Sequence, residues 1–302
     1  MTATYPAAVE RGTVAAGERG RSPASAAWQR LVASPAARAG LIMVVAFLVL
    51  ALVTPLVHVY DARTDANLGF RLRSPTAAHP FGTDSLGRDI LVRILHATRV
   101  SLGLAISAVA VAAVLGSAMG FLAGYLRGRV DLAVMFCMDI VLAFPATLLA
   151  IAIVAMIGPG LRNSLFAISL VSIPAYARLS RSSVLALREQ EFVLAAQGLG
   201  GSVGRVLASH IVPNSLPPLI VQTTLSIAFA ILEAAALGFL GLGAQPPTPE
   251  WGAMLADSYK YFTSGAWWVF CFPGAAIMLS VLGFNLLGDG LRDALDPRLG
   301  PS

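Results

Sequence analysis

Few residues in this chain have the type and spacing that catalysis needs. The four histidines lie in separate segments, and none belongs to an HExxH metal-binding motif. The single lysine, Lys260, follows Tyr259, so the Gly-Lys-Ser/Thr sequence of a phosphate-binding P-loop is missing. No Ser/His/Asp arrangement stands out. We therefore expect no catalytic residue, no metal site and no cofactor in this chain, so another chain or an ion gradient must supply energy for work on a solute.

Two carboxylates have positions from which they could act inside a membrane. Asp139 precedes a long uncharged run, and Glu233 lies within an apolar stretch. Ionisable groups in such places are costly and often mark ion or solute pathways. For Asp139, structural and functional roles remain equally open, because its side chain could reach the lipid headgroups. For Glu233, which should face a helix bundle, helix packing competes with a role in proton transfer.

The composition indicates what kind of protein positions these residues. The chain has 302 residues, of which 57% are hydrophobic and only 12% are charged. An ordinary soluble domain has about 25% charged residues. With a mean hydropathy of +0.75, both a soluble enzyme and a disordered chain are excluded. The net charge of +5 fits basic cytoplasmic loops better than a nucleic-acid surface, since no arginine block with interleaved aromatics occurs. We predict a multi-pass helical membrane protein.

Uncharged runs locate the expected spans, because charge at the centre of a bilayer is costly. The six runs cover residues 39–60, 100–126, 140–161 (starting near Leu132), 163–177, 206–232 and 261–288. A span needs about 20 residues, and only the run 163–177, which contains Pro174, is shorter. It crosses if Arg178 snorkels or if the bilayer thins locally. We predict an all-α fold with six transmembrane helices.

The arginines predict the orientation. In the six-span arrangement, the arginines of segments 1–38, 127–129, 178–213 and 291–302 fall on one side, which the positive-inside rule makes the cytoplasm. The long loop 61–99, with six arginines against four aspartates, is an exception. We expect a mobile cytoplasmic tail (1–38), a first transmembrane helix (39–60), an external loop (61–99), a core of five spans (100–290) and a cytoplasmic tail (291–302).

The external loop ends in a distinctive segment, His79-Pro-Phe-Gly-Thr-Asp-Ser-Leu-Gly-Arg-Asp. From Leu86 onward the apolar residues have helical spacing, which predicts an amphipathic helix. Asp84 or Ser85 could cap it, with Arg88, Asp89 and Arg93 along its polar face. The helix could lie at the membrane interface before the second span, or it could contact a partner or guide a solute.

The loop 178–213 is the longest predicted cytoplasmic connection. Residues 181–197 are good helix formers, Gly200 and Gly201 break the chain, and a second short helix can follow up to Pro213. Ala195 and Ala196 are small enough to let a partner's backbone approach closely. A solvated loop without a binding role is the alternative, but a loop of this length is uncommon without a function.

Two further patterns predict packing rather than chemistry. Gly116, Gly120, Gly124 and Gly128 form a four-residue repeat of small residues that allows close helix approach. The three prolines of segment 245–255 predict a rigid external loop. The tryptophans Trp251, Trp267 and Trp268 suit the interfacial aromatic belt.

Together these segments resemble the C-type permease subunit of dipeptide, oligopeptide and nickel ATP-binding-cassette (ABC) importers, over about residues 35–300. The resemblance rests on the segment His79–Asp89, the loop ending in Gly200 and Ile211-Val212-Pro213, Phe239-Leu-Gly-Leu-Gly, and Pro247-Thr-Pro-Glu-Trp-Gly-Ala-Met-Leu. The family's cytoplasmic motif begins Glu-Ala-Ala, with a glycine after three further residues. Here Leu194 replaces that glutamate, and Glu191 lies about one helical turn away.

The resemblance implies a type I ABC importer permease fold in the plasma (inner) membrane, with both termini in the cytoplasm. It implies a non-catalytic subunit that pairs with a B-type permease, two ATPase subunits that bind ATP and magnesium, and an external substrate-binding protein. Residues 188–204 would form a coupling helix in an ATPase cleft. Its candidate residues are Arg188, Glu191, Leu194, Ala195, Ala196, Gly198, Gly200 and Gly201, and those of the external loop are Asp84, Gly87, Arg88 and Asp89.

The substrate remains open between dipeptides, longer peptides, glutathione and a nickel chelate. An ion-coupled secondary transporter that acts alone is the competing hypothesis, motivated by Asp139 and Glu233. The absence of evident inverted repeats in the sequence counts against it.

Overall fold

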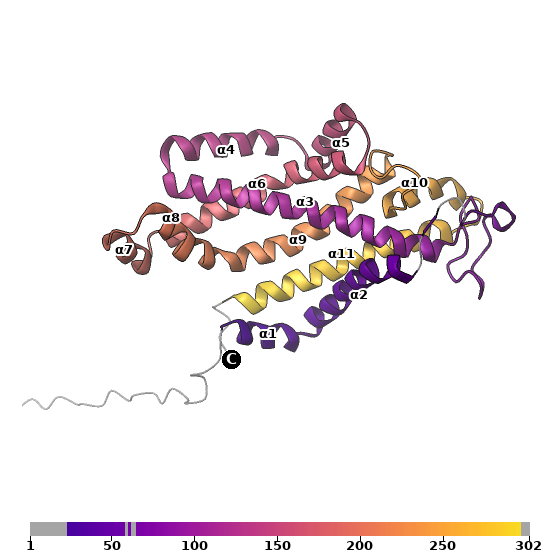
Figure 1. The fold of residues 1–302 in the computed structure, drawn as a ribbon, viewed down its shortest axis with the longest axis horizontal. Helices are drawn as coiled ribbons and strands as arrows, with labels where there is room; N and C mark the ends of the chain where they lie inside the picture. Colours follow the sequence, from indigo (N-terminus) through magenta and orange to yellow (C-terminus); the bar gives the residue numbers. More distant parts are fainter. Residues whose placement is uncertain (1–22, 58–59, 62–64, 297–302) are drawn as a thin grey trace, which may run out of the picture.

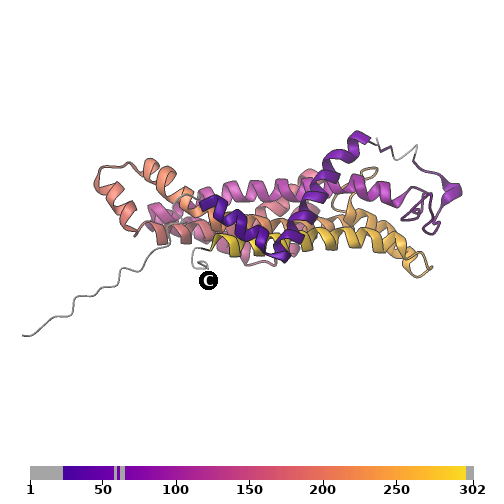
Figure 2. The ribbon, with the colours of Figure 1, turned by 90° about the horizontal axis from the view of Figure 1, so that it is seen from below.

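A computed structural model describes residues 23–57, 60–61 and 65–296 of the chain. Across these residues every regular element is a helix, apart from one isolated bridge between Thr83 and Asp89. The helices run roughly along one axis, with α7 and α8 at one end and the segment that precedes α3 at the other (Figures 1 and 2). The two segments that the sequence singles out therefore lie at opposite ends of the bundle.

The helices are α1 (Pro23–Ala33), α2 (Pro35–Val57), the 3-10 turn η1 (Leu68–Phe70), α3 (Ile90–Leu126), α4 (Gly128–Leu142), α5 (Ala146–Ile157), α6 (Leu161–Leu187), α7 (Glu191–Gly198), α8 (Val203–Val206), a π-helical turn (Leu207–Ile211), α9 (Val212–Phe239), α10 (Trp251–Phe262) and α11 (Trp268–Leu295).

The centre of the bundle is the pair α3 and α6, which α9 and α11 flank. Small residues on α3 allow this pair to approach closely. A Cβ atom added to Gly116 would lie 2.6 Å from the carbonyl oxygen of Ile173, and one added to Gly124 would lie 2.8 Å from the Cβ of Val184. The predicted small-residue contact is confirmed for Gly116, Gly120 and Gly124. Gly128 is different, since it starts α4 with φ +58° and an added Cβ would meet nothing.

Four helices of the described chain are long and apolar enough to cross a membrane: Pro35–Val57, Ile90–Leu126, Val203–Phe239 and Trp268–Leu295. They overlap four of the predicted runs, with bounds that differ by up to ten residues. The third run divides into α4 and α5, which meet at 87°. Pro145 directly precedes α5, where its missing N–H and fixed φ end regular helical bonding. Asp139 therefore lies near the end of α4, not early in a straight span.

The fourth predicted run is part of a longer helix. The helix α6 has 27 residues, Leu161–Leu187, and continues through Pro174 and Arg178. It is not among the helices apolar enough to count as spans in the described residues. The count of six spans stays a prediction.

The amino-terminal tail contains more structure than its sequence indicated. The helix α1 occupies part of the predicted tail, and α2 begins at Pro35 rather than near Ala39. Leu31 packs against Ala37 and Ala294, so α1 lies on the end of α11. Tertiary contact therefore orders a segment without clear helical periodicity. Residues 1–22 of the predicted mobile tail lie outside the described residues.

The predicted start of a helix at Leu86 is wrong, although a helix follows four residues later and continues into the second predicted span. The helix α3 begins at Ile90, and Asp89 caps it by accepting a hydrogen bond from the backbone N–H of Val92 at 3.1 Å. Residues 84–88 form a turn in which Gly87 has φ +74°. Two of the belt tryptophans are also buried: Trp251 is 0% exposed and Trp268 is 8% exposed, whereas Trp267 is exposed. The Nε1–H groups of Trp251 and Trp268 donate to the carbonyls of Ile94 and Thr83.

Candidate functional site

The connection between α6 and α9 forms a compact elbow at one end of the bundle (Figure 1). Val193 of α7 is fully buried and packs with Val184, Val206 and Ile211. This cluster joins α7 to the end of α6 and to the start of the helix that continues into α9. The elbow is thus a packed unit rather than a solvated loop.

Two glycines set the corner of the elbow. Gly200 adopts φ +82°, a conformation that favours glycine. The N–H of Gly201 donates to the carbonyl of Ala196 at 3.0 Å, and an added Cβ at Gly201 would lie 2.7 Å from that oxygen. The predicted break at these glycines is confirmed. The helix before it is shorter than the predicted residues 188–204, because α7 ends at Gly198.

Arginine side chains tie the elbow to its neighbours. Arg188 follows the last turn of α6, and its Nη1 donates to the carbonyls of Gly124 and Tyr125 at 3.4 and 3.3 Å. Those carbonyls end α3, where the negative end of the helix dipole favours a cation. About two turns before Arg188, Arg181 of α6 donates through Nη2 to Asp131 of α4 at 2.6 Å. The second half of α6 is therefore bonded to both α3 and α4.

The outer side of the elbow is apolar and exposed. Four large apolar side chains form what we call the elbow surface: Phe192, Leu194, Leu199 and Val203, of which Leu199 is 90% exposed. Glu191, Ala195 and Gly198 are also exposed, while Ala196 is half-buried. Exposed apolar groups gathered on one element are typical of an interaction site. Leu194, which replaces the family's glutamate, lies on this surface.

The other end of the bundle carries a buried ionic cluster, here called the charged cap, made of Asp84, Arg88 and Arg93. Asp84 Oδ2 accepts from Arg88 Nε at 2.7 Å and from Arg93 Nη1 at 2.6 Å. Its Oδ1 accepts from the backbone N–H groups of Leu86 and Arg88. All three side chains are less than a tenth exposed. The cap fixes the turn that precedes α3, which is a structural role.

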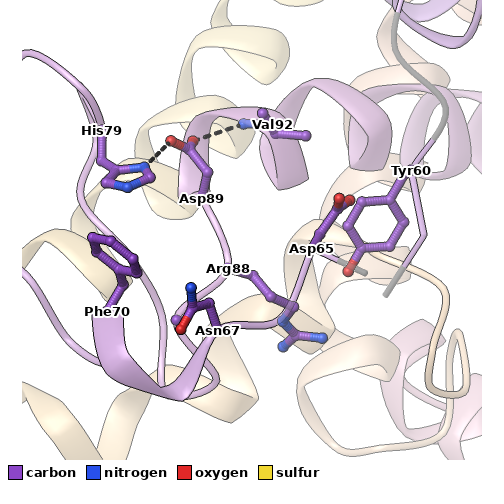
Figure 3. A pocket seen from close by; sticks show the side chains of 9 residues that line it. Tyr60, Asp65, Asn67, Phe70, His79, Arg88, Asp89 and Val92 are labelled. Atoms are coloured by element: carbon purple, nitrogen blue, oxygen red, sulfur yellow. Dashed lines mark hydrogen bonds and ion pairs between the residues drawn. The ribbon is translucent and has the colours of Figure 1, made fainter. Parts of the chain in front are cut away.

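His79 and Asp89 close the same turn, as Figure 3 shows. His79 Nδ1 lies 2.8 Å from Asp89 Oδ2, and both line a cavity of about 390 Å³ together with Tyr60, Phe70 and Arg88. Gly87 is essential to the turn, because an added Cβ would collide with the carbonyl of Asn67. The structure therefore brings together all four predicted external residues, Asp84, Gly87, Arg88 and Asp89.

The sequence drew attention to the segment around Glu250 without assigning a role to that residue. Glu250 is 1% exposed and caps α10 by accepting from the N–H groups of Gly252 and Ala253 at 2.9 Å. Ser101 of α3 donates to it at 3.1 Å. Burial raises the pKa of the Glu250 carboxyl, against the hydrogen bonds that lower it. An acid directly before an apolar helix is a capping signal that could have identified it.

The two intramembrane acids have separate partners. Asp139 accepts from Arg178 Nη2 at 2.6 Å, and both side chains are more than half exposed. Glu233 of α9 accepts from the hydroxyl of Thr147 of α5 at 2.6 Å. Among the described residues no group of histidine, cysteine and acidic side chains could hold a metal ion. The structure does not bring Asp139 and Glu233 together.

The fold itself resembles a solved transporter. An inward-facing structure of the MetNI methionine ABC transporter has a chain that aligns with a TM-score of 0.57 at 17% identity, covering 68% of this chain and 98% of that one. At this identity the likeness shows the fold alone. The likeness defines the class of fold: an all-helical bundle like that of a chain of an ABC transporter.

Sequence comparison identifies the family. Residues 112–301 match the family described as "Binding-protein-dependent transport system inner membrane component", and residues 22–75 match "N-terminal TM domain of oligopeptide transport permease C". The chain therefore belongs to the inner-membrane components of binding-protein-dependent transport systems, in the C-type permease class.

Two curated relatives show how far the similarity extends. The dipeptide transport system permease protein DppC of Alkalihalophilus pseudofirmus is 50% identical over 278 residues, 92% of this chain and 91% of its own. The glutathione transport system permease protein GsiD of Pectobacterium atrosepticum is 42% identical, over 92% of each chain. This chain thus aligns with nearly the full length of both relatives.

Proposed function

We propose that this chain forms half of the translocation pathway of an ATP-driven importer of dipeptides or short oligopeptides. It would pair with a B-type permease, receive its substrate from an external binding protein, and be moved by two ATPase subunits that bind ATP and magnesium. The 50% identity to a dipeptide transport permease supports the peptide substrate. The permease itself would be non-catalytic.

The exposed elbow surface is the observation that carries the coupling role. Leu194 and Leu199 are exposed while Val193 of the same segment is fully buried. Such an element can fit an ATPase cleft with its outer face while its inner face stays attached to the bundle. Closure of the ATPases would push α7, and the bonds of Arg188 to the end of α3 would pass the movement into the bundle. The bundle would then shift between two states that the ATPases stabilise differently.

The coupling role requires α7 and both termini to face the cytoplasm. Cysteine labelling tests this directly, after the two native cysteines, Cys137 and Cys271, which are exposed, are replaced by serine. We expect an impermeant maleimide added to intact spheroplasts to label Leu68→Cys but not Leu199→Cys, whose side chains are 70% and 90% exposed. Labelling of Leu199→Cys from outside would reject the coupling role.

A second experiment tests the ATPase contact. Leu194→Asp places a charge at the centre of the elbow surface, and loss of a buried interface anchor typically costs about 2 kcal/mol or more. We expect at least a tenfold loss of ATPase co-purification with the tagged permease and a matching loss of peptide uptake. Leu68→Asp, an exposed leucine at the opposite end, is the matched control and should retain the ATPases. Normal ATPase retention and uptake in Leu194→Asp would contradict the proposal.

A glutathione substrate is the second candidate, supported by the 42% identity to a glutathione permease. Competition in a reconstituted importer separates the two. The substrate is a labelled dipeptide, and the competitors are unlabelled dipeptide, glutathione and a nickel chelate. We expect the unlabelled dipeptide to reduce uptake of the label most strongly. Stronger competition by glutathione would transfer the assignment to that solute without changing the architecture.

A further inference from the structure

A groove of about 470 Å³ lies between α3 and the first turns of α6. Two arginines, Arg99 and Arg162, flank it, and apolar residues including Leu104 and Leu165 line it. The helices α3 and α6 run side by side with the same direction, so the groove lies near the end of the bundle opposite α7 (Figure 1).

The two arginines differ from the arginines of the bundle that are paired within the chain. Arg88, Arg93, Arg178 and Arg181 each pair with an aspartate. Arg99 and Arg162 are exposed, and in residues 23–57, 60–61 and 65–296 neither guanidinium has a hydrogen bond or an ion pair. Two positive charges therefore face the groove without a compensating anion.

The start of α6 adds to the positive potential. Its N-cap residue is Gly160, which offers no side-chain acceptor to the first N–H groups of the helix. Those groups and the helix dipole favour an anion at this position. Arg162 lies in the same turn, so the free arginine and the uncapped helix end act at one place.

The remainder of the groove is suited to hydrocarbon. Arg99 marks the edge of a long uncharged segment, since residues 100–126 have no charge. Gly103 lies one turn further along α3, and an added Cβ there would meet no atom within 4 Å. The missing side chain leaves room beside Leu104. Charge at the membrane edge and apolar space beyond it match an amphipathic molecule rather than a soluble anion.

We propose that this groove binds an anionic phospholipid, with its phosphate between Arg99 and Arg162 and an acyl chain along Gly103 and Leu104. Guanidinium groups bind phosphate with strong, charge-assisted hydrogen bonds. A headgroup with net negative charge leaves no ammonium to oppose the two arginines, so phosphatidylglycerol binds more tightly than phosphatidylcholine. The inference depends on the membrane location of the chain and not on the substrate or on the ATPase contact.

Native mass spectrometry of the assembled importer tests the site, after purification from nanodiscs of mixed phosphatidylglycerol and phosphatidylcholine. We expect wild-type importer to retain phosphatidylglycerol. Arg99→Gln and Arg162→Gln should each weaken its retention about fivefold, and the two together should act nearly multiplicatively. A Cβ added at Gly103 meets no atom within 4 Å, so we expect the ring of Gly103→Phe to occupy the apolar part of the groove and displace the lipid. Arg129 is an exposed arginine at the start of α4, beyond the far end of α3 from the groove. Arg129→Gln is therefore the matched control and should have no effect on lipid retention.

The proposal is overturned if the double variant retains phosphatidylglycerol like wild type, or if both lipids are retained equally. A photo-crosslinking residue at Leu165 provides an independent readout, because it should capture lipid. Capture of the second permease would instead make the groove a subunit interface. If the arginine variants do not assemble, Gly103→Phe alone decides: unchanged lipid retention in that variant rejects the acyl-chain site.

Discussion

At the end of the bundle that carries residues 65–89, Asp84, Arg88 and Arg93 are buried and bonded to one another, whereas at the α7 end Leu194 and Leu199 are exposed. The charged cap therefore satisfies its costly groups within the chain. The elbow surface leaves apolar side chains exposed, while the opposite face of α7 packs against the bundle through Val193. The difference is that the charged cap satisfies its charges within this chain, whereas the elbow surface is available for the proposed contact with another protein.

This contrast also separates two kinds of sequence motif. The segment His79–Asp89 is distinctive because several of its residues bond to each other, so substitution of Asp84 or Gly87 would disturb the fold of the turn. In the proposed function, the segment Leu194–Gly201 is distinctive because its shape and exposed face would fit an ATPase subunit. Mutations in the first kind of motif should lower the stability of the fold. Mutations in the second kind should reduce assembly with the ATPases and transport.

The largest expected effect comes from Asp84→Asn. This change leaves Arg88 and Arg93 buried without their shared carboxylate, and breaking a buried charge pair costs about 3–5 kcal/mol. We expect poor accumulation and a much lower midpoint of thermal unfolding of the detergent-solubilised importer. An unchanged midpoint would show that the charged cap is not structural.

Gly120→Ala should have the next largest effect. An added Cβ would collide with the carbonyl oxygen of Ala177 and lie 2.8 Å from the Cβ of Ser180. Overpacking of this kind costs about 1–3 kcal/mol. Gly103→Ala on the same helix meets no atom within 4 Å and should leave the unfolding midpoint unchanged. Equal midpoints for the two variants would mean that α3 and α6 can separate freely.

Arg188→Gln should act on transport more than on stability. It removes the charge-assisted bonds to the carbonyls of Gly124 and Tyr125, worth about 1–2 kcal/mol. Because the elbow surface stays intact, the ATPases should still co-purify while ATP-dependent uptake falls several-fold. Arg129→Gln controls for the loss of a charge. Loss of ATPase binding in Arg188→Gln would place this arginine in the interface instead of in the connection to α3.

The smallest effect is expected for Asp139→Asn. This substitution is the chemical match of Asp84→Asn, but it breaks an ion pair whose side chains are 54% and 60% exposed. Exposed pairs contribute about 0–1 kcal/mol. We expect little change in the unfolding midpoint and no change in uptake. A large loss of uptake with normal stability would instead give Asp139 a role in the pathway.

Sequence reasoning located the main helices and the break at Gly200 and Gly201. It did not predict several contacts between side chains at the two ends of the bundle. The periodicity from Leu86 is real, yet the helix starts at Ile90 because residues 84–88 turn around the Asp84 carboxylate. Trp251 has the residue type of an interfacial anchor, but it is buried, and it donates hydrogen bonds to the carbonyl of Ile94 and the hydroxyl of Ser101 on α3. Asp131 and Arg181 are fifty residues apart along the chain, and only the packing of α4 on α6 reveals the pair.

The sequence by itself determined that the chain is a helical membrane protein, and its motifs were sufficient to indicate the permease family. Those properties follow from hydropathy, charge spacing and local motifs, each of which depends on residues close together in the chain. Only the tertiary structure decided which carboxylate pairs with which arginine, that α4 and α5 meet at 87°, and that Arg99 and Arg162 share a groove. These features depend on distances between helices that are remote in sequence, which packing sets and local patterns do not record.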